Sequence, residues 1–253
     1  MKIKVLASGS KGNCTYIEYG QTRLLIDIGI SYLAIAKSLE SINVVPSSIS
    51  GVLITHNHKD HIKGLASFIK RTNTQVYVPE GIKEQLKDII PLANISVIDT
   101  FSQIGDFNIE LFPTSHDTPY SVGYIISCLL EKLVYITDTG YINKKLFSKL
   151  KDADIYIIES NHDESLLMDG SYPYYLKQRV IGDEGHLSNH MTAEYLSKFV
   201  GEHTKYIVLA HLSENNNTEA LAYQTTKDEL ISVNKDREII LAKQYEATAL
   251  IEV

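Results

Sequence analysis

Three histidines and an aspartate lie within one short segment of this sequence. They are His56, His58, Asp60 and His61, in the pattern H-x-H-x-D-H. Imidazole nitrogens and carboxylate oxygens are the ligands that Zn²⁺ and similar ions take, and a chance cluster of this density is not expected from nine histidines. We therefore predict a metal centre at this segment, with a second ion sharing the site.

Further candidate ligands follow predicted strands farther along the chain. His116 follows the apolar residues 111–113, Asp138 follows 134–137 and His211 follows 206–210. The H-x-H-x-D-H segment itself follows an apolar, β-branched stretch. Because the carboxyl ends of strands open on one edge of an α/β sheet, we expect these side chains to meet there. Two ions close together could then share a bridging carboxylate.

The rest of the sequence predicts the elements that position these residues. Short apolar segments predict strands, and segments of helical periodicity between some of them predict helices. The predicted strands are 3–7, 15–19, 24–28, 51–55, 75–78, 95–98, 109–113, 122–126, 132–137, 155–160, 206–210, 238–241 and 247–252. The predicted helices are 31–41, 62–70, 81–89, 143–149, 188–199 and 218–232. No linker or repeat divides the chain, so we expect one domain, residues 1–253, of two packed sheets with helices outside.

Composition narrows the protein class. No apolar segment is long enough to span a membrane, and the N-terminus predicts a strand rather than a signal peptide, so we expect a cytoplasmic protein without a membrane partner. The two cysteines, Cys14 and Cys128, form no C-x-x-C pair, and we expect both to be buried apolar residues. The net charge of −7 disfavours nucleic-acid binding by the overall field, but bound cations would add positive charge locally.

The ligand order resembles that of the metallo-β-lactamase fold hydrolases over nearly the whole chain. The resemblance implies an αβ/βα four-layer sandwich of two mixed β-sheets with helices outside. It also implies that His56, His58 and His116 hold a first metal, that Asp60, His61 and His211 hold a second, and that Asp138 bridges them. The β-lactam-hydrolysing branch has Cys at the position of Asp138, so a β-lactamase is not expected.

Glu159 and His186 lie between Asp138 and His211 in chain order. Their placement resembles a Glu and a G-H-S-T His of transfer-RNA 3′-processing endonucleases of this fold, in which the His donates a proton to the leaving oxygen. The alternatives are a salt bridge at a strand end for Glu159 and a hydrogen bond at the start of a helix for His186. An alkoxide leaving group needs protonation more than a thiolate does, so the pair favours phosphodiester over thioester hydrolysis.

Five segments resemble the YycJ/WalJ family of bacterial, cytoplasmic 5′-to-3′ DNA exonucleases. They are residues 8–13, 159–163, 172–179, 185–189 and 211–216. The resemblance implies DNA as the substrate, which composition and periodicity do not address. The chain is too short for the RNA-processing members with an inserted domain, and the stretch between His116 and Asp138 is too short for the arm of the transfer-RNA enzymes.

Several residues are candidates for substrate contacts. Ser10 and Asn13 belong to a Gly-containing turn, which is either a hairpin turn or a backbone cradle for phosphate. Lys177 and Arg179 follow three tyrosines, a pairing that grips single strands or forms a tyrosine-rich core edge with solvated cations. Ser188 and Asn189 either cap the following helix or face a phosphate at its N-terminus.

The sequence thus predicts a hydrolase with two divalent ions, Zn²⁺ or Mn²⁺ with Fe also suited. We expect a DNA exonuclease in which a hydroxide between the metals attacks phosphorus, Asp60 orients that hydroxide, and Glu159 and His186 protonate the leaving oxygen. The alternatives are a small-molecule esterase or thioesterase related to hydroxyacylglutathione hydrolase, and a noncatalytic metal-binding scaffold. We expect no stable protein partner.

Overall fold

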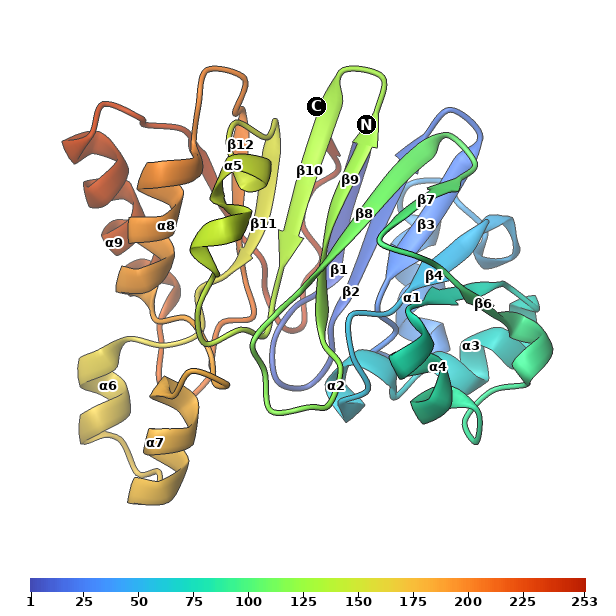
Figure 1. The fold of residues 1–253 in the computed structure, drawn as a ribbon, viewed down its shortest axis with the longest axis horizontal. Coiled ribbons are helices and arrows are strands. Elements are labelled where there is room, and N and C mark those ends of the chain that lie inside the picture. Colours follow the sequence, from blue (N-terminus) through green and yellow to red (C-terminus); the bar gives the residue numbers. More distant parts are fainter.

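Two seven-stranded sheets pack against each other in the computed structural model, which describes residues 1–253 (Figure 1). The first sheet has the order β14-β1-β2-β3-β4-β5-β6 and the second the order β13-β12-β11-β10-β9-β8-β7. In the first, β3 to β6 are parallel and the remaining pairs antiparallel. In the second, β7 to β10 are antiparallel and β10 to β13 parallel. Both sheets are therefore mixed, as predicted.

The strands are short and mostly buried. They are β1 (Lys2–Ala7), β2 (Cys14–Tyr19), β3 (Thr22–Ile26), β4 (Gly51–Leu53), β5 (Val76–Val78), β6 (Ile95–Val97), β7 (Phe101–Ile104), β8 (Phe107–Pro113), β9 (Val122–Cys128), β10 (Glu131–Ile136), β11 (Ile155–Glu159), β12 (Tyr206–Ala210), β13 (Glu238–Leu241) and β14 (Ile251–Glu252). Both cysteines are free and buried, as expected.

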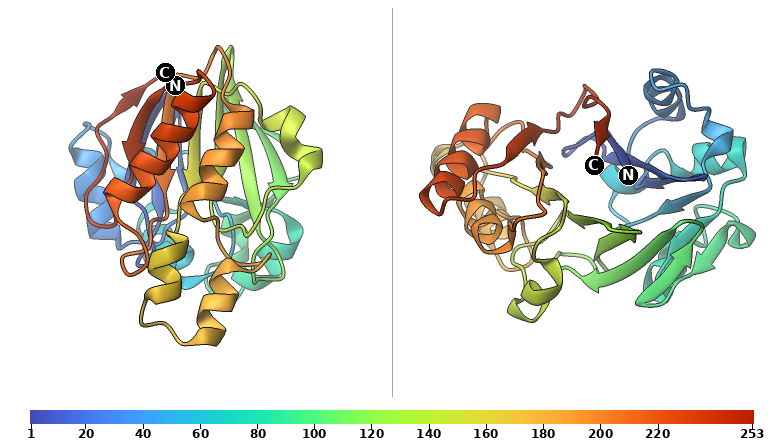
Figure 2. Two further views of the ribbon diagram at one scale, coloured as in Figure 1. Left: turned by 90° about the vertical axis from the view of Figure 1, so that its left-hand side faces the viewer. Right: turned by 90° about the horizontal axis from the view of Figure 1, so that it is seen from above.

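Helices form the two outer layers (Figure 2). They are α1 (Tyr32–Glu40), α2 (Lys59–Ile62), α3 (Leu65–Thr72), α4 (Glu80–Leu86), α5 (Phe147–Leu150), α6 (Glu164–Asp169), α7 (Tyr174–Ile181), α8 (Asn189–Phe199) and α9 (Glu219–Ser232), with short 3-10 turns at Pro46–Ser48, Leu92–Asn94 and Lys144–Leu146. None of these helices has the length and apolar character that crossing a membrane would demand.

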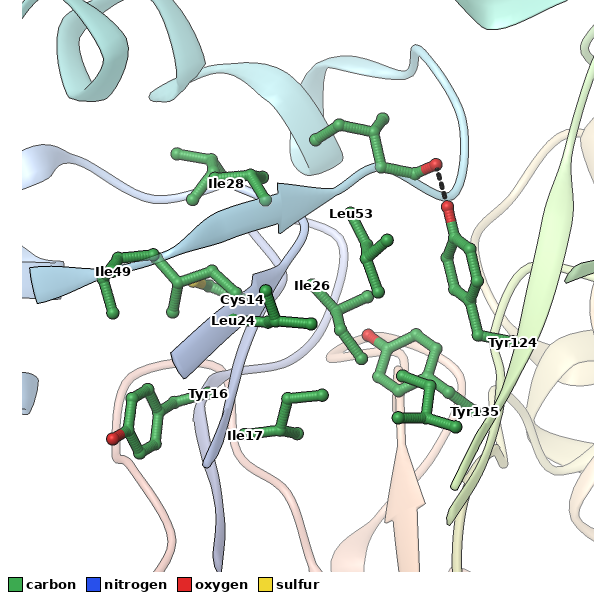
Figure 3. Packing of buried hydrophobic residues seen from close by; sticks show 14 of the residues in the cluster. Cys14, Tyr16, Ile17, Leu24, Ile26, Ile28, Ile49, Leu53, Tyr124 and Tyr135 are labelled. Atoms are coloured by element: carbon green, nitrogen blue, oxygen red, sulfur yellow. Dashed lines mark hydrogen bonds between the residues drawn. The ribbon is translucent and has the colours of Figure 1, made fainter. Parts of the chain in front are cut away.

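Two apolar clusters stabilise the layers. The larger, of 43 buried residues, lies between the sheets and beneath α1, α3 and α4, and the smaller, of 17, lies between the second sheet and α5, α8 and α9. The hydroxyl of Tyr124 on β9 donates to the carbonyl of Ile54 at 2.6 Å, across the larger cluster (Figure 3). This bond ties the second sheet to the backbone that leads into the H-x-H-x-D-H segment.

The structure departs from the predicted elements in two places that matter for the site. The helix predicted over 62–70 is two helices separated at Gly64, where a Cβ would lie 1.9 Å from the carbonyl oxygen of Ile30. The elements β7, α6 and α7 were not predicted from the sequence. Helices α6 and α7 project beyond the sheet edge (Figures 1 and 2), and we call them, with residues 170–173 between them, the α6–α7 arm.

Candidate metal centre

The predicted ligands converge at one end of the sandwich. Their donor atoms form overlapping groups, each with all atoms within 4.8 Å of one another. One group is His56, His58 and His116, and we call it the three-histidine group. The others are Asp60, His61 and His211; His56, His61 and Asp138; and Asp138, Glu159, His186 and His211. The structure thus brings together every residue that the sequence analysis proposed as a ligand, with Glu159 and His186 beside them.

Three polar residues at the cluster have unusual backbone conformations. Asp27, Asp138 and His211 follow β3, β10 and β12, and have φ of 61°, 56° and 55°. Residues other than glycine rarely adopt this left-handed conformation, which costs energy and is found at functional sites. A left-handed residue directly after a strand turns the chain sharply and leaves its side chain at the sheet edge. The strained backbone at these residues therefore places their side chains in the cluster.

Backbone hydrogen bonds fix the H-x-H-x-D-H turn both to the turn between β1 and β2 and to the residues that follow β3. Asn13 N donates to Asp60 O at 2.8 Å, and Ile28 N donates to His61 O at 2.7 Å. Gly29 permits this close approach, because a Cβ at that position would lie 1.7 Å from Asp60 O. The Asn13 side chain lies 3.3 Å from Asp60 Oδ2. The turn between β1 and β2 therefore positions the ligand segment.

Each histidine that contributes to these ligand groups, His58 apart, has a hydrogen-bond partner behind it. His61 Nδ1 donates to Asp27 at 2.8 Å, and His211 Nδ1 donates to Glu159 at 2.9 Å. The partners of the remaining histidines are the hydroxyl of Thr55 for His56, the carbonyl of Gly185 for His116 and Glu159 for His186. Such partners fix the ring orientation and leave the opposite nitrogen for a cation.

Asp27 is a site residue that the sequence analysis missed. Its side chain is completely buried and also accepts from the backbone N and the hydroxyl of Thr55. Asp27 directly follows β3 in the structure, just as Asp138 and His211 follow their strands, but the sequence placed it inside the predicted strand 24–28. Nothing local distinguishes it from a capping aspartate, so only the fold reveals the contact with His61.

The histidines of the cluster differ in the direction in which their surroundings shift their pKa. Burial lowers the pKa of His56 and His58, which favours the neutral, ligand-competent form. Burial also opposes charge on His61 and His211, but Asp138 and the neighbouring carboxylates raise the pKa of both well above the usual range. Burial would raise the pKa of Asp138, and the charges of His211 and His61 hold it well below its usual range.

Glu159 and His186 form a pair at the edge of this cluster. His186 Nδ1 donates to Glu159 Oε1 at 2.7 Å, and the backbone N of Thr139 and of Leu187 donate to Oε2 at 3.2 Å. Burial would raise the pKa of Glu159, but His186 and His211 lower it to about 2. Glu159 is thus a buried carboxylate that orients two histidines at once.

The donor set fits divalent cations. Nε2 of His56 is buried and has no hydrogen-bond partner. A buried polar atom left unpaired is costly and rare, and ligation by a cation would satisfy it. Imidazoles and carboxylates within a few ångströms of one another are also the ligands of Zn²⁺ and Mn²⁺ sites. The cluster therefore has the composition and the unmet bonding capacity of a metal centre.

A cavity of about 330 Å³ opens onto the cluster. Among the proposed substrate contacts, Ser10 and Arg179 line it. Ser188 and Asn189 are buried elsewhere: Ser188 accepts from Met191 N as the cap of α8, and Asn189 bonds to Ser160 and Asn217. Asn13 is buried beneath Asp60, and Lys177 donates to Met168 O on α6. These four side chains are thus not among those that line the cavity.

The remaining sequence candidates are accounted for by the fold. The exposed rings of Tyr174 and Tyr175 lie on the α6–α7 arm, whereas Tyr172 lines the cavity, so the tyrosines do not form a core edge. His203 is exposed and pairs with Asp152 at 2.7 Å on the surface.

The fold and the cluster define a class. Residues 22–212 match the family model described as the Beta-lactamase superfamily domain. The structure also resembles that of the metallo-beta-lactamase fold protein YhfI from Bacillus subtilis, with a TM-score of 0.72, 16% identity and coverage of 98% of this chain and 99% of that one. The protein is a hydrolase of the metallo-β-lactamase superfamily.

Two curated relatives place it more finely. The chain is 35% identical to exodeoxyribonuclease WalJ of Streptococcus pneumoniae serotype 2 over 100% of this chain and 98% of the relative. It is 36% identical to exodeoxyribonuclease YycJ of Bacillus anthracis over 88% of this chain and 86% of the relative. The chain belongs to the WalJ/YycJ family, which confirms the resemblance noted from its motifs.

Proposed function

We propose that the protein is a DNA exonuclease that holds two divalent metal ions, Zn²⁺ or Mn²⁺, and removes nucleotides from the 5′ end. The observation that carries this proposal is that the ligand cluster opens onto a cavity that His186, held by Glu159, also lines. The names of the WalJ and YycJ relatives support DNA as the substrate.

In this proposal, the cluster is divided between the two ions. His56, His58 and His116 would hold one ion, Asp60, His61 and His211 the other, and Asp138 would lie between them. Divalent ions bound there would neutralise phosphate charge and make water a nucleophile near neutral pH.

The protein's own groups orient the reactants and move the proton. The Asp60 carboxylate lines the cavity and can accept a hydrogen bond from the attacking water. Glu159 holds Nδ1 of His186, so the opposite nitrogen, Nε2, is available to donate a proton to the departing 3′ oxygen. Ser10 and Arg179 line the cavity where they can contact the nucleic-acid backbone.

The test is digestion of DNA labelled at the 5′ or the 3′ end, both duplex and single-stranded. Metal-stripped protein is reloaded separately with Mn²⁺ and Zn²⁺, and Asp138→Ala protein serves as the blank. We expect the wild type to release the 5′ label first and then to shorten the DNA stepwise from that end. Neither event should occur with Asp138→Ala. Release from the 3′ end would overturn the polarity, and turnover of a glutathione thioester without DNA cleavage would overturn the substrate assignment.

A further inference from the structure

Asp117 directly follows His116 and connects the metal cluster to the α6–α7 arm. Its Oδ2 is paired with the guanidinium of Arg179 on α7. Its Oδ1 is buried, has no hydrogen-bond partner and lies 3.6 Å from Nε2 of His58. The carboxylate therefore lies between a helix of the arm and one histidine of the three-histidine group.

The two ring nitrogens of His58 face in different directions. Nδ1 lies 3.2 Å from Nε2 of His116, on the side of the three-histidine group, whereas Nε2 faces Asp117. A negative oxygen near Nε2 favours the tautomer with its hydrogen there, which leaves the Nδ1 lone pair free for a cation. Asp117 thus lies behind His58 as Asp27 lies behind His61 and Glu159 behind His211, although at 3.6 Å its contact is an ion pair rather than a hydrogen bond.

Asp117 is placed to orient a ligand rather than to be one. Its Oδ1 also lies 3.5 Å from Nε2 of His116, but Asp117 belongs to none of the groups whose donor atoms lie within 4.8 Å of one another. His116 is already oriented, because its Nδ1 donates to Gly185 O at 3.2 Å. The unfilled role is therefore the one behind His58.

We propose that Arg179, Asp117 and His58 form a link through which the α6–α7 arm sets the cation affinity of the three-histidine group. The proposal rests on the proposed function, in which this group holds a cation. Arg179 holds Asp117 in place, and Asp117 in turn positions His58. Because coupling free energies are reciprocal, a cation in the group also stabilises the position of α7.

Arg179 is well suited to this task, and its neighbours provide controls. Arg179 is the only Lys or Arg that lines the cavity. Lys177 lies two positions earlier on the same helix but donates to Met168 O. Glu184 lines the same cavity as Asp117, yet it is exposed and makes no ion pair with a histidine. Substitutions at Lys177 and Glu184 therefore change the same charges without breaking the link.

The first test measures cation affinity by chelator competition with Zn²⁺ and with Mn²⁺ in the absence of DNA. We expect Asp117→Asn to weaken the binding of one of two cations by about ten- to a hundredfold. Arg179→Gln should weaken the same cation by a smaller factor, because its guanidinium is largely exposed. Glu184→Gln and Lys177→Gln should leave both affinities unchanged. Wild-type affinity in Asp117→Asn would overturn the proposal.

The second test asks whether the residues act in series. The double variant Asp117→Asn, Arg179→Gln should bind cations no more weakly than Asp117→Asn alone, whereas the losses from independent effects would add. Added cation should also slow amide hydrogen exchange in residues 174–181 of the wild type and have no such effect in Asp117→Asn. Additive losses, or equal protection of α7 in both proteins, would contradict the link.

These outcomes separate the link from the proposed function. A wild-type protein that binds two cations but leaves DNA intact would overturn the proposed substrate and leave the link standing. A protein that cuts DNA while Asp117→Asn binds cations normally would overturn the link alone. Failure of the wild type to bind any divalent cation would overturn both.

Discussion

Asp27 accepts a hydrogen bond from Nδ1 of His61 at 2.8 Å, and both side chains are fully buried. This contact directs Nε2 of His61 toward Asp60 and Asp138, at 3.4 and 3.2 Å. A carboxylate behind a metal-binding histidine fixes its orientation and increases its basicity. Asp27 therefore belongs to the candidate metal centre although it is not itself a proposed ligand.

Asp27→Asn should weaken cation binding by about ten- to a hundredfold, because the amide retains the shape but not the charge behind His61. Chelator competition measures the effect. Asp152→Asn is the matched control, since Asp152 also pairs with a histidine, His203, at 2.7 Å, but on the surface. Equal affinities in Asp27→Asn and the wild type would show that Asp27 has only a structural role.

Glu159→Gln and His186→Asn should each lower kcat on DNA by about a hundredfold or more, because proton donation to the leaving oxygen depends on the pair. The double variant should be about as slow as the slower single variant, since residues that act as a unit give non-additive losses. Single-turnover rates at saturating metal test this. Multiplicative losses would mean that the two residues act separately.

Metal removal should lower the thermal stability of the protein. A cation that binds only the folded state, at a free concentration of about 100 times its Kd, stabilises that state by about 2.7 kcal/mol. For a chain of this length, about 2 to 4 °C per kcal/mol gives an increase in Tm of about 5 to 11 °C. Thermal unfolding with chelator and with added Mn²⁺ measures the shift. Asp138→Ala should lose most of it, and an undiminished shift in that variant would place the stabilising cation elsewhere.

Glu18 should make stability depend on pH at acidic values. Burial would raise its pKa, but hydrogen bonds from Tyr16, Arg23 and Lys2 lower it from 4.5 to about 2. A carboxylate whose pKa is lowered by folding contributes stability above its unfolded pKa and loses that contribution as pH falls through the folded value.

The corresponding variant is Glu18→Gln, compared with Glu246→Gln at an exposed carboxylate. Urea unfolding at neutral pH should show Glu18→Gln to be less stable than the wild type. The difference should shrink as the pH falls from 4.5 toward 2. A difference that is independent of pH would mean that the charge of Glu18 does not stabilise the fold.

The sequence by itself determined the types of candidate ligand and most of the elements that present them. The H-x-H-x-D-H residues are close in sequence, so their ligand chemistry can be predicted without knowledge of the fold. They are His56, His58, Asp60 and His61. His116, Asp138 and His211 could be predicted because each follows an apolar strand, and strand ends meet at a sheet edge. The capped helices α8 and α9 were also predicted, since Ser188 and Thr218 mark their first turns.

Tertiary structure alone decided which polar residues orient those ligands. Three acidic residues contact histidines that are 27 to 59 residues away in the chain: Asp27, Glu159 and Asp117. Asp117 also pairs with Arg179 on α7. No local periodicity encodes such contacts. The arm was missed for a related reason: α6 and α7 are short and expose much of their apolar surface, so they lack a strong amphipathic pattern. Long-range packing, rather than local propensity, determines where these groups lie.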